Sequence, residues 1–400
     1  MTDGSSANRA ALPQLVYIGD VPIESSYHGS ALIFRLLQRY PADRLVVIER
    51  STSRSLPSRR LADVRYEELG SRIGRLLTTR VHRMAASWLV VNAKRLAGRI
   101  PSLIGDFSPE AVLTVAHGFS WLTASAFAER TRLPLHLIVH DDWPGMATLI
   151  TPVRRWMEQR YGEVYRQAAS RLCVSPQMVS EYERRYRAKG TLLYPSRARG
   201  VPEFDASDTE VRDDRPFSIA FAGSLNVGDY VRQLVELSWL LPKVGGRLLL
   251  FGPFEPELLA AKGANTEAIV FGGLLSSAEL ITRIHAEADV VFVPESFEQG
   301  NVMNLSFPSK LTDYTAAARP LLIWGPERSA AVDWAGKEPG LAAVVTNREP
   351  DAMARMLKKL AGDPIWRRQL SAVAAAVGKR YFAPERAQSI LYDALATARK

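Results

Sequence analysis

The stretch Ala288–Pro326, ADVVFVPESFEQGNVMNLSFPSKLTDYTAAARPLLIWGP, decides the fold. Its apolar run Val290–Val293 has the length of a buried parallel strand. A polar loop follows, and Pro308-Ser309 then begins a predicted helix with Ser309 as its N-cap. The next apolar run, Leu321–Trp324, predicts a second buried strand. This order of strand, loop, helix and strand is typical of an open α/β sheet, which binds ligands at the carboxyl edge of its strands.

Two polar side chains stand in the first turns of this predicted helix. Lys310 would bring an ammonium group close to the free backbone N–H groups of the helix start, and this combination suits an anion. Asp313 follows one turn later, and its carboxylate suits a sugar or ribose hydroxyl. The alternative is that these residues only cap and solvate a helix of an ordinary α/β protein.

The segment 308–322, PSKLTDYTAAARPLL, resembles the donor-site segment of retaining GT-B glycosyltransferases, the family 4 group and its relatives. The pattern there is roughly P-x-K-[LF]-x-E-Y-x-A-x-G-[KR]-P. Asp313 stands where the family usually has Glu, and Ala318 stands where it usually has Gly. The resemblance implies an α/β protein of two doubly wound Rossmann-like domains that face a cleft. A nucleotide sugar would bind the C-terminal domain and an acceptor the N-terminal one.

The bulk composition agrees with two α/β domains. The chain has 400 residues, 47% of them hydrophobic and 23% charged, which is ordinary for a globular protein of this size. No run of about 18 apolar residues occurs, so we expect no membrane-spanning helix. The start lacks the charged and apolar regions of a signal peptide, which favours a cytoplasmic location. The single Cys173 lies in an apolar run and is predicted to be a buried structural thiol.

The net charge of +9 is concentrated in one region. Residues 50–100 carry twelve Lys or Arg and three acids, a local excess equal to that of the whole chain. Residues 51–70 predict a polar loop, and Ser71–Ile100 has the apolar periodicity of one basic amphipathic helix. Such a helix favours either an anionic membrane surface, at the inner face of the cell membrane, or a solvated basic face over a sheet. Nothing in it resembles a nucleic-acid recognition element, so we expect no nucleic-acid partner.

The chain opens with a predicted strand, helix and strand, Gln14–Ile18, Ser30–Arg39 and Leu45–Ile48. This is the first βαβ unit of a doubly wound domain, and it lacks a G-x-G-x-x-G motif. Family 4 enzymes have glycines near this helix start, beside the acceptor and the donor phosphate. The resemblance therefore assigns Gly29 and Ser30 to the acceptor side. His28 is either part of that group or a loop histidine with no role.

Histidines and acids follow two further predicted strands. Ala111–Val115 is followed by His117, and Leu135–Val139 by His140 and Asp141. Because the carboxyl ends of neighbouring parallel strands meet at one edge of a sheet, these side chains are expected on its ligand side.

The run His140–Pro144, HDDWP, is similar to an H-D-x-W-P stretch that borders the interdomain cleft in many family 4 enzymes. The resemblance implies catalytic roles for His140 and Asp141 and an acceptor-side place for His117. Alternatively, Trp143-Pro144 closes a turn and Asp142 caps it.

A polar segment, 195–215, is rich in Pro, Gly and charge and predicts an interdomain linker. We therefore expect an N-terminal domain over 1–200 and a C-terminal nucleotide-sugar domain over 201–383. The last helix, 384–400, is expected to pack back on the first domain, as in other GT-B enzymes.

The donor half begins with the predicted strand Phe217–Phe221, followed by Gly223-Ser224 and a helix. Glycine directly after a strand allows close approach of a ligand to the backbone. This loop resembles the family's phosphate-side loop, F-x-G-x-L-x-x-x-K/R, and Arg232 is the nearest basic residue to its last position. The alternative is a plain connection between strand and helix.

Two more segments resemble donor-site elements of the family. The segment that begins at Phe271 resembles the family pattern F-x-G-x-x-[ST]-x-x-E-L, where the nucleobase rests against the backbone, and Phe271 and Leu274 are the candidate contacts. Ser276 and Glu279 follow and predict a capping box at the start of the next helix. Glu298 lies in a degenerate E-G-F-G loop that faces the donor sugar, and its contribution is predicted to be catalytic. Glu295 is its rival for that role.

Taken together, these motifs predict a glycosyltransferase that moves a sugar from a nucleotide sugar to a glycan or lipid-linked acceptor in bacterial polysaccharide or glycoconjugate synthesis. The nucleotide sugar is a co-substrate, and no other cofactor is expected. No metal is expected either, because no D-x-D motif stands in a suitable loop. The resemblance implies retention of configuration, whereas inversion would follow if Asp141 acted as a general base.

Two alternatives stay open at this stage. One is a nucleotide-sugar epimerase of the same fold, which an acidic, hydroxyl-activating pair would favour. The other is a non-catalytic scaffold in a membrane-associated assembly, which the departures at Asp313 and Ala318 would favour. Turnover of a nucleotide sugar would exclude the scaffold.

Overall fold

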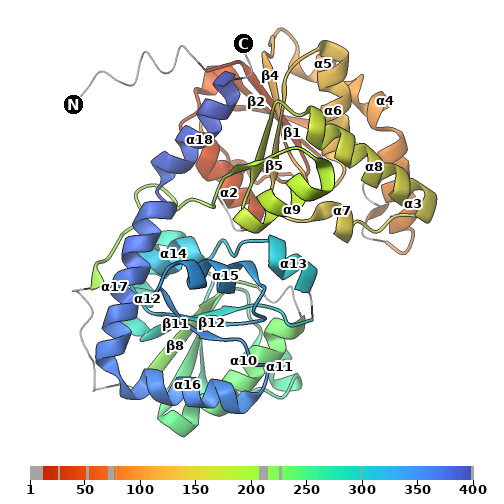
Figure 1. The fold of residues 1–400 in the computed structure, drawn as a ribbon. Coiled ribbons are helices and arrows are strands. Elements are labelled where there is room, and N and C mark those ends of the chain that lie inside the picture. The colour runs from red at the N-terminus through yellow and green to blue at the C-terminus, as the bar shows by residue number, and fades with distance from the viewer. Residues whose placement is uncertain are drawn as a thin grey trace, which may run out of the picture. The chain divides into compact units, whose positions relative to one another are not determined.

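The computed structural model describes residues 12–25, 28–50, 54–70, 76–77, 79–206, 215–224, 228–298 and 300–397. The chain forms two compact units (Figure 1). The first unit is Met1–Tyr194 together with Pro384–Lys400, and the second is Pro195–Ala383. The chain therefore passes from the first unit to the second at Pro195, within the segment predicted as a linker, and returns at Pro384.

The first unit contains a seven-stranded parallel sheet in the order β3-β2-β1-β4-β5-β6-β7. Its strands are β1 (Leu15–Gly19), β2 (Leu45–Arg50), β3 (Arg65–Leu69), β4 (Ala111–Val115), β5 (Leu135–Val139), β6 (Ser170–Cys173) and β7 (Thr191–Leu192). The prediction of a loop over 51–70 was wrong at β3. This edge strand escaped detection because its sequence, RYEEL, is polar and its side chains are mostly solvated.

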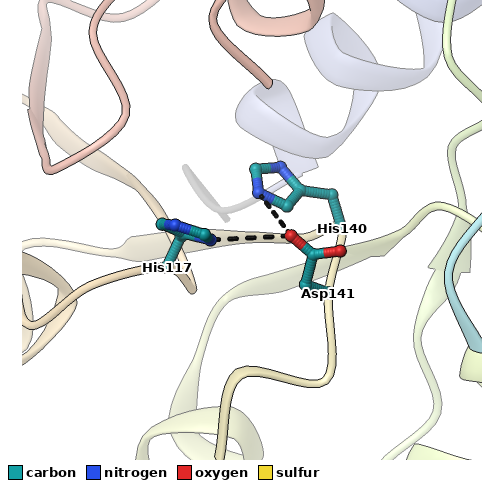
Figure 2. Close-up of side chains that lie close together, drawn as sticks. All are labelled: His117, His140 and Asp141. Carbon is teal, nitrogen blue, oxygen red and sulfur yellow. Dashed lines mark ion pairs between the residues drawn. The ribbon is translucent and has the colours of Figure 1, made fainter. Parts of the chain in front are cut away.

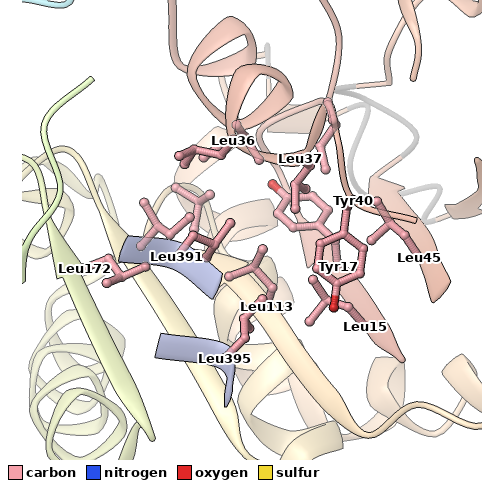
Figure 3. Packing of buried hydrophobic residues seen from close by; sticks show 14 of the residues in the cluster. Leu15, Tyr17, Leu36, Leu37, Tyr40, Leu45, Leu113, Leu172, Leu391 and Leu395 are labelled. Carbon is pink, nitrogen blue, oxygen red and sulfur yellow. The ribbon is translucent and has the colours of Figure 1, made fainter. Parts of the chain in front are cut away.

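Helices cover both faces of this sheet (Figure 1). They are α2 (His28–Leu37), α3 (His82–Val91), α4 (Ala93–Ala97), α5 (Ile100–Ile104), α6 (Ser120–Thr131), α7 (Trp143–Met146), α8 (Thr151–Gln167), α9 (Pro176–Tyr186) and α18 (Pro384–Thr397), with short 3-10 turns at Ala42–Arg44 and Pro57–Arg59. The last helix belongs to this unit, because Leu391 and Leu395 pack into the same core as Leu36 and Leu113 (Figure 3).

The prediction of one helix over Ser71–Ile100 was also wrong. Residues 71–75 and 78 lie outside the described residues, and the separate helices α3, α4 and α5 begin only at His82, Ala93 and Ile100. The first break is at Asn92, whose backbone leaves helical geometry while its side-chain Nδ2 donates to the Trp88 carbonyl at 3.0 Å. Asparagine competes for backbone partners in this way, and this is the reason that it interrupts helices.

The second unit contains a six-stranded parallel sheet in the order β10-β9-β8-β11-β12-β13. The strands are β8 (Phe217–Ala222), β9 (Gly246–Phe251), β10 (Ile269–Gly273), β11 (Val290–Pro294), β12 (Leu321–Trp324) and β13 (Ala342–Val345). The helices are α10 (Gly228–Leu240), α11 (Pro256–Ala261), α12 (Ser277–Glu287), α13 (Gly300–Leu305), α14 (Leu311–Ala316), α15 (Ala330–Lys337), α16 (Pro350–Gly362) and α17 (Pro364–Tyr381), with 3-10 turns at Leu241–Val244 and Thr266–Ala268.

Two details of helix α14 differ from the sequence prediction. Ser309 is not its N-cap: the N-cap position is Lys310, in helical backbone geometry and without a side-chain capping bond. The turn before the helix is closed by the backbone instead, since Thr312 N donates to the Ser309 carbonyl at 3.2 Å. At the other end Ala318 takes a left-handed φ of 50°, so the tight turn forms although glycine is absent.

Both sheets are doubly wound, and the strand order reverses next to β1 in one and next to β8 in the other. In the first unit β1 pairs with β2 on one side and β4 on the other, and in the second β8 pairs with β9 and β11. The loops after the carboxyl ends of these strands are the expected ligand-binding places of such sheets. None of the described helices has both the length and the apolar content needed to cross a membrane.

Candidate functional site

Three polar side chains converge after strands β4 and β5 of the first unit (Figure 2). Asp141 Oδ2 lies 3.5 Å from His117 Nδ1 and 3.4 Å from His140 Nε2. His140 is the most buried of the three, with its side chain 10% exposed, while about a third of the other two is open to solvent. The structure thus brings together two predicted catalytic residues and one predicted acceptor-side residue.

The surroundings of this cluster hold its rings in place. The His117 ring lies 4.5 Å from the Trp143 ring, between centroids. Gly29 borders His140 closely: a Cβ at position 29 would lie 3.0 Å from His140 Cε1, so a larger residue there would crowd the imidazole. Gly29 and Ser30 lie in the first turn of α2, and the His28 side chain lies outside the described part.

Asp142, the residue after Asp141, has a structural role. Asp142 occupies the N-cap position of α7 but makes no side-chain capping bond. Its carboxylate instead accepts hydrogen bonds from the Tyr182 hydroxyl at 2.9 Å and from Arg185 Nη1 at 3.0 Å. Asp142 therefore anchors the loop after β5 to α9, which leaves Asp141 as the acid of the cluster.

The electrostatics favour a neutral His140. Burial lowers the pKa of its imidazole, and the nearby His117 adds to this effect, while Asp141 acts in the opposite direction. A neutral imidazole beside a carboxylate can accept a proton or orient a hydroxyl group. The cluster can thus bind and polarise a sugar hydroxyl.

The same three side chains are the described residues that could hold a metal ion, since their ligand atoms lie within 4.8 Å of one another. The separations of 3.4 and 3.5 Å are close to the distance of about 3.3 Å between ligands of a tetrahedral zinc ion with bonds of about 2.0–2.1 Å. Two imidazoles and one carboxylate are also a donor set that suits zinc. The geometry therefore fits a zinc ion, although the sequence contains no D-x-D motif in a suitable loop.

A buried ion pair missed by the sequence analysis supports this edge of the sheet. Asp20, directly after β1, pairs with Arg50 and accepts backbone hydrogen bonds from Phe119 and Ser120 at the start of α6. Burial opposes ionisation of Asp20, but Arg50 and the backbone donors outweigh it and lower the pKa of this carboxyl. Gly118 must lack a side chain here, because a Cβ would collide with Asp20. The pair therefore fixes the loop that carries His117.

In the second unit, Lys310 meets the loop after β8. Its Nζ lies 4.1 Å from the centroid of the Phe221 ring and 5.6 Å from that of Tyr230. A Cβ at position 223 would lie 3.4 Å from the same Nζ. Gly223 has a φ of 146°, which side-chain-bearing residues rarely adopt. Two predicted donor-binding residues from segments far apart in sequence are thus neighbours.

Glu295 completes this group. It directly follows β11, is 2% exposed, and its Oε2 is buried without a hydrogen-bond partner among the described residues. Burial raises the pKa of the Glu295 carboxyl to about 8, against the opposing charge of Lys310. Burial likewise lowers the pKa of Lys310 to about 8, while Glu295 opposes that shift. Of the two acids weighed from the sequence, Glu295 is the one coupled to Lys310.

Glu298 lies in a different environment. Its side chain is 59% exposed and accepts a hydrogen bond from Arg348 Nη2 at 2.9 Å. Arg232 is similarly engaged, because it forms an ion pair with Asp229 one turn before it in α10. The roles predicted for Glu298 and Arg232 are not tested by these contacts and stay predictions.

The remaining predicted donor residues lie in three separate segments of the second unit. Asp313 lies in the first turn of α14 and accepts a hydrogen bond from Thr312 Oγ1 at 3.3 Å. Phe271 packs partly against the core, whereas Leu274 is 59% exposed. Ser224 is half-buried beside Gly223, and Ser309 is exposed before Lys310.

Comparison with solved structures identifies the fold. The chain resembles HepE from Anabaena in complex with UDP-glucose, with a TM-score of 0.63 and 12% identity over 96% of this chain and all of the other. Sucrose-phosphate synthase from Thermosynechococcus elongatus gives 0.64 and 15% over 94% and 97%. α,α-Trehalose 6-phosphate synthase from Burkholderia multivorans gives 0.63 and 12% over 96% and 98%. The chain therefore has the GT-B fold, as the sequence predicted.

No protein-family model and no curated protein sequence matches the chain.

Proposed function

We propose that this protein is a glycosyltransferase that moves a sugar from a nucleotide-sugar donor to a glycan or lipid-linked acceptor. The observation that carries the proposal is the position of the Lys310 ammonium beside the Gly223 backbone, at the carboxyl edge of the β8–β11 switch point. A solved structure of the same fold holds UDP-glucose, which supports a donor of this class.

The donor would bind the second unit through its diphosphate. The reaction leaves a nucleoside diphosphate, so positive charge near that group stabilises the transition state. Lys310 supplies such a charge, and the lack of a side chain at Gly223, beside the Lys310 Nζ, allows close approach of a ligand to this turn. Asp313 and Leu274 are the proposed contacts of the ribose and the base, and Glu298 that of the donor sugar.

The acceptor would bind the first unit at His117, His140 and Asp141. The carboxylate and the neutral imidazole orient the acceptor hydroxyl, and this positioning removes much of the entropic barrier to transfer. We propose retention of configuration and catalysis without a metal ion. The support for metal independence is that Lys310 already supplies positive charge for the leaving diphosphate.

The proposal is tested by incubating the protein with single nucleotide sugars and measuring release of nucleoside diphosphate. Wild type is expected to release one diphosphate, slowly to water and faster when the right acceptor is added. Lys310→Met and Asp141→Asn are expected to abolish release. Absence of release from every nucleotide sugar, in a folded protein presented with a broad acceptor extract, would favour the non-catalytic scaffold.

The epimerase alternative gives a different result in the same assay. An epimerase would change the configuration of the nucleotide sugar without release of a diphosphate.

A further inference from the structure

A basic pocket lies between helices α3 and α8 of the first unit. Its volume is about 590 Å³, and it is lined by Arg83, Gly145, Ala147, Thr148, Leu149, Thr151, Arg154, Arg155 and Glu158. Arg154 pairs with Glu158 at 2.9 Å. Arg83 and Arg155 form no ion pair with any described residue, so two guanidinium groups are available to a ligand in this pocket.

Exposed apolar side chains are adjacent in sequence to residues that line the pocket. Met84, next to Arg83, is 69% exposed, and Trp156, next to Arg155, is 47% exposed. Ile150, in the loop before α8, is 42% exposed. The two helices are held side by side, because Ile150 N donates to Ser87 Oγ of α3 at 3.3 Å (Figure 1). Large apolar residues beside unpaired arginines form an amphipathic surface.

This combination has a specific physical preference. Guanidinium groups bind phosphate through planar, charge-assisted hydrogen bonds. Exposed Met, Ile and Trp side chains gain free energy when they leave water for the boundary between lipid headgroups and acyl chains. A soluble phosphate compound would satisfy the arginines alone, whereas a lipid in a bilayer would satisfy both.

The pocket is also close in sequence to the His117–His140–Asp141 cluster. One of its lining residues, Gly145, is four positions after Asp141 and donates its N–H to the Asp142 carbonyl at 3.0 Å. The Trp143 ring, in the same short helix α7, contacts the His117 ring. A ligand held by the arginines would therefore be bound next to the segment that carries the proposed acceptor site.

We infer that this pocket binds the phosphate group of an anionic lipid in a bilayer, with Met84, Ile150 and Trp156 entering the headgroup region. The inference deepens the proposed function and rests on it for one point, namely that the acceptor is a lipid-linked phosphate. The inference also differs from the expectation that the basic segment 71–100 alone contacts the membrane. The arginines come from two helices, α3 and α8, instead of one continuous basic helix.

The test is co-sedimentation of the full chain with vesicles, in the absence of nucleotide. Wild type is expected to bind vesicles of equal parts phosphatidylglycerol and phosphatidylcholine, and not pure phosphatidylcholine. Arg83→Gln/Arg155→Gln is expected to weaken binding about 30-fold, since each basic residue near an anionic surface contributes about 5-fold. Met84→Ser should weaken binding without any change in its dependence on anionic lipid.

A matched control removes two equally exposed charges from helix α4, Lys94→Gln/Arg95→Gln. It should bind the mixed vesicles like wild type. Equal weakening by both double variants would show a diffuse basic surface and overturn the pocket. Absence of wild-type binding, or equal binding to pure phosphatidylcholine, would overturn the inference as well. All these positions are exposed, so the variants should keep the wild-type melting temperature.

A separate melting-temperature experiment with inorganic phosphate distinguishes a free phosphate from a lipid phosphate. If inorganic phosphate raises the melting temperature of wild type but not of Arg83→Gln/Arg155→Gln, and vesicles do not bind, the pocket takes a free phosphate and the lipid is excluded. Because the vesicle experiment contains no nucleotide, its outcome is independent of the diphosphate-release assay, and either experiment can fail while the other succeeds. Failure of the inference and failure of the proposed function are therefore distinguishable.

Discussion

Lys310 Nζ lies over the face of the Phe221 ring, 4.1 Å from its centroid. A cation over an aromatic face is stabilised by about 2 kcal/mol when it is shielded from water. Glu295 acts on this ammonium through its charge, but its Oε2 makes no hydrogen bond to any described residue. The ammonium is thus held in place beside Gly223 while its hydrogen-bonding capacity is left for an anion.

Replacement of Gly223 by alanine should weaken nucleotide binding. The φ of 146° would strain any residue with a Cβ, and the added methyl would lie 3.4 Å from Lys310 Nζ. We expect a loss of about 1–3 kcal/mol in stability from the strained backbone and a clear loss of affinity for nucleoside diphosphate. Gly228→Ala is the control, because a Cβ there meets open space. Equal nucleotide affinity in Gly223→Ala and wild type would contradict the placement of the diphosphate.

Replacement of Glu295 by glutamine should change how stability depends on pH. The folded protein holds the Glu295 proton up to a pKa of about 8, against an ordinary value of 4.5. This contribution to stability is complete below about pH 4.5 and is lost as the pH rises through about 8. Thermal unfolding between pH 5 and pH 8 should therefore show a steeper loss of stability in wild type than in Glu295→Gln.

Lys310 acts on stability above that window. Its pKa is lowered from 10.5 to about 8, so charging it opposes folding below about pH 8, and this cost is relieved as the pH rises toward 10.5. Lys310→Met should remove that rise in stability above pH 8. Identical pH profiles for wild type and both variants would show that the two groups are not buried together.

Replacement of Asp141 by asparagine should reduce turnover far more than donor binding. Loss of a group that positions or deprotonates a hydroxyl lowers the rate by about 100- to 10,000-fold. His117→Ala should raise the KM for the acceptor, since its partly exposed ring flanks the carboxylate at 3.5 Å. Steady-state kinetics with both substrates would separate these effects, and a changed nucleotide affinity in Asp141→Asn would contradict the assignment of the cluster to the acceptor.

Metal ions should affect the proposed transfer activity only as inhibitors. Treatment with EDTA is expected to leave the rate unchanged. Zinc is expected to inhibit, because His117, His140 and Asp141 present a donor set at zinc-like spacing and would lose their capacity to bind the acceptor. His117→Ala should require more zinc for the same inhibition. Loss of activity in EDTA that returns with a divalent ion would contradict the metal-independent mechanism.

Replacement of Glu298 by alanine tests whether this exposed acid, unlike the buried Glu295, contacts the donor sugar. Its side chain is mostly exposed, and a surface pair such as that with Arg348 contributes about 0–1 kcal/mol. Glu298→Ala should therefore leave the melting temperature nearly unchanged, and any loss of rate would report a contact with the donor sugar. If Glu298→Ala changes neither the rate nor the KM for the donor, its predicted catalytic role is wrong.

The regular parts of the fold were predictable because they follow from buried apolar runs. Strands such as β1, β4, β8 and β11 are mostly apolar segments, and the N-caps at Ser175 and Ser276 make the bonds that their spacing predicts. The edge strand β3 was missed because its sequence is polar and its formation depends on pairing with β2. The helix break at Asn92 was missed because it depends on one side chain that competes for a backbone carbonyl.

The candidate site was only partly predictable. The sequence placed His117, His140 and Asp141 at neighbouring strand ends, and the geometry brings them within contact. The coupling of Glu295 to Lys310 depends on the tertiary packing that buries both side chains together, which local sequence does not specify. The Asp20–Arg50 pair was missed for the same reason, because its residues are 30 positions apart and belong to no recognisable motif.

The central claim is that Lys310 holds the diphosphate of a nucleotide sugar. Isothermal titration of nucleoside diphosphates against wild type, Lys310→Met and Lys337→Met tests it directly, since Lys337 is an exposed lysine paired with Asp333. One nucleotide should bind wild type and Lys337→Met equally. Lys310→Met should bind it about 10- to 100-fold more weakly, as loss of a charged hydrogen bond predicts. Unchanged affinity in Lys310→Met, or no binding of any nucleotide by folded wild type, would contradict the account.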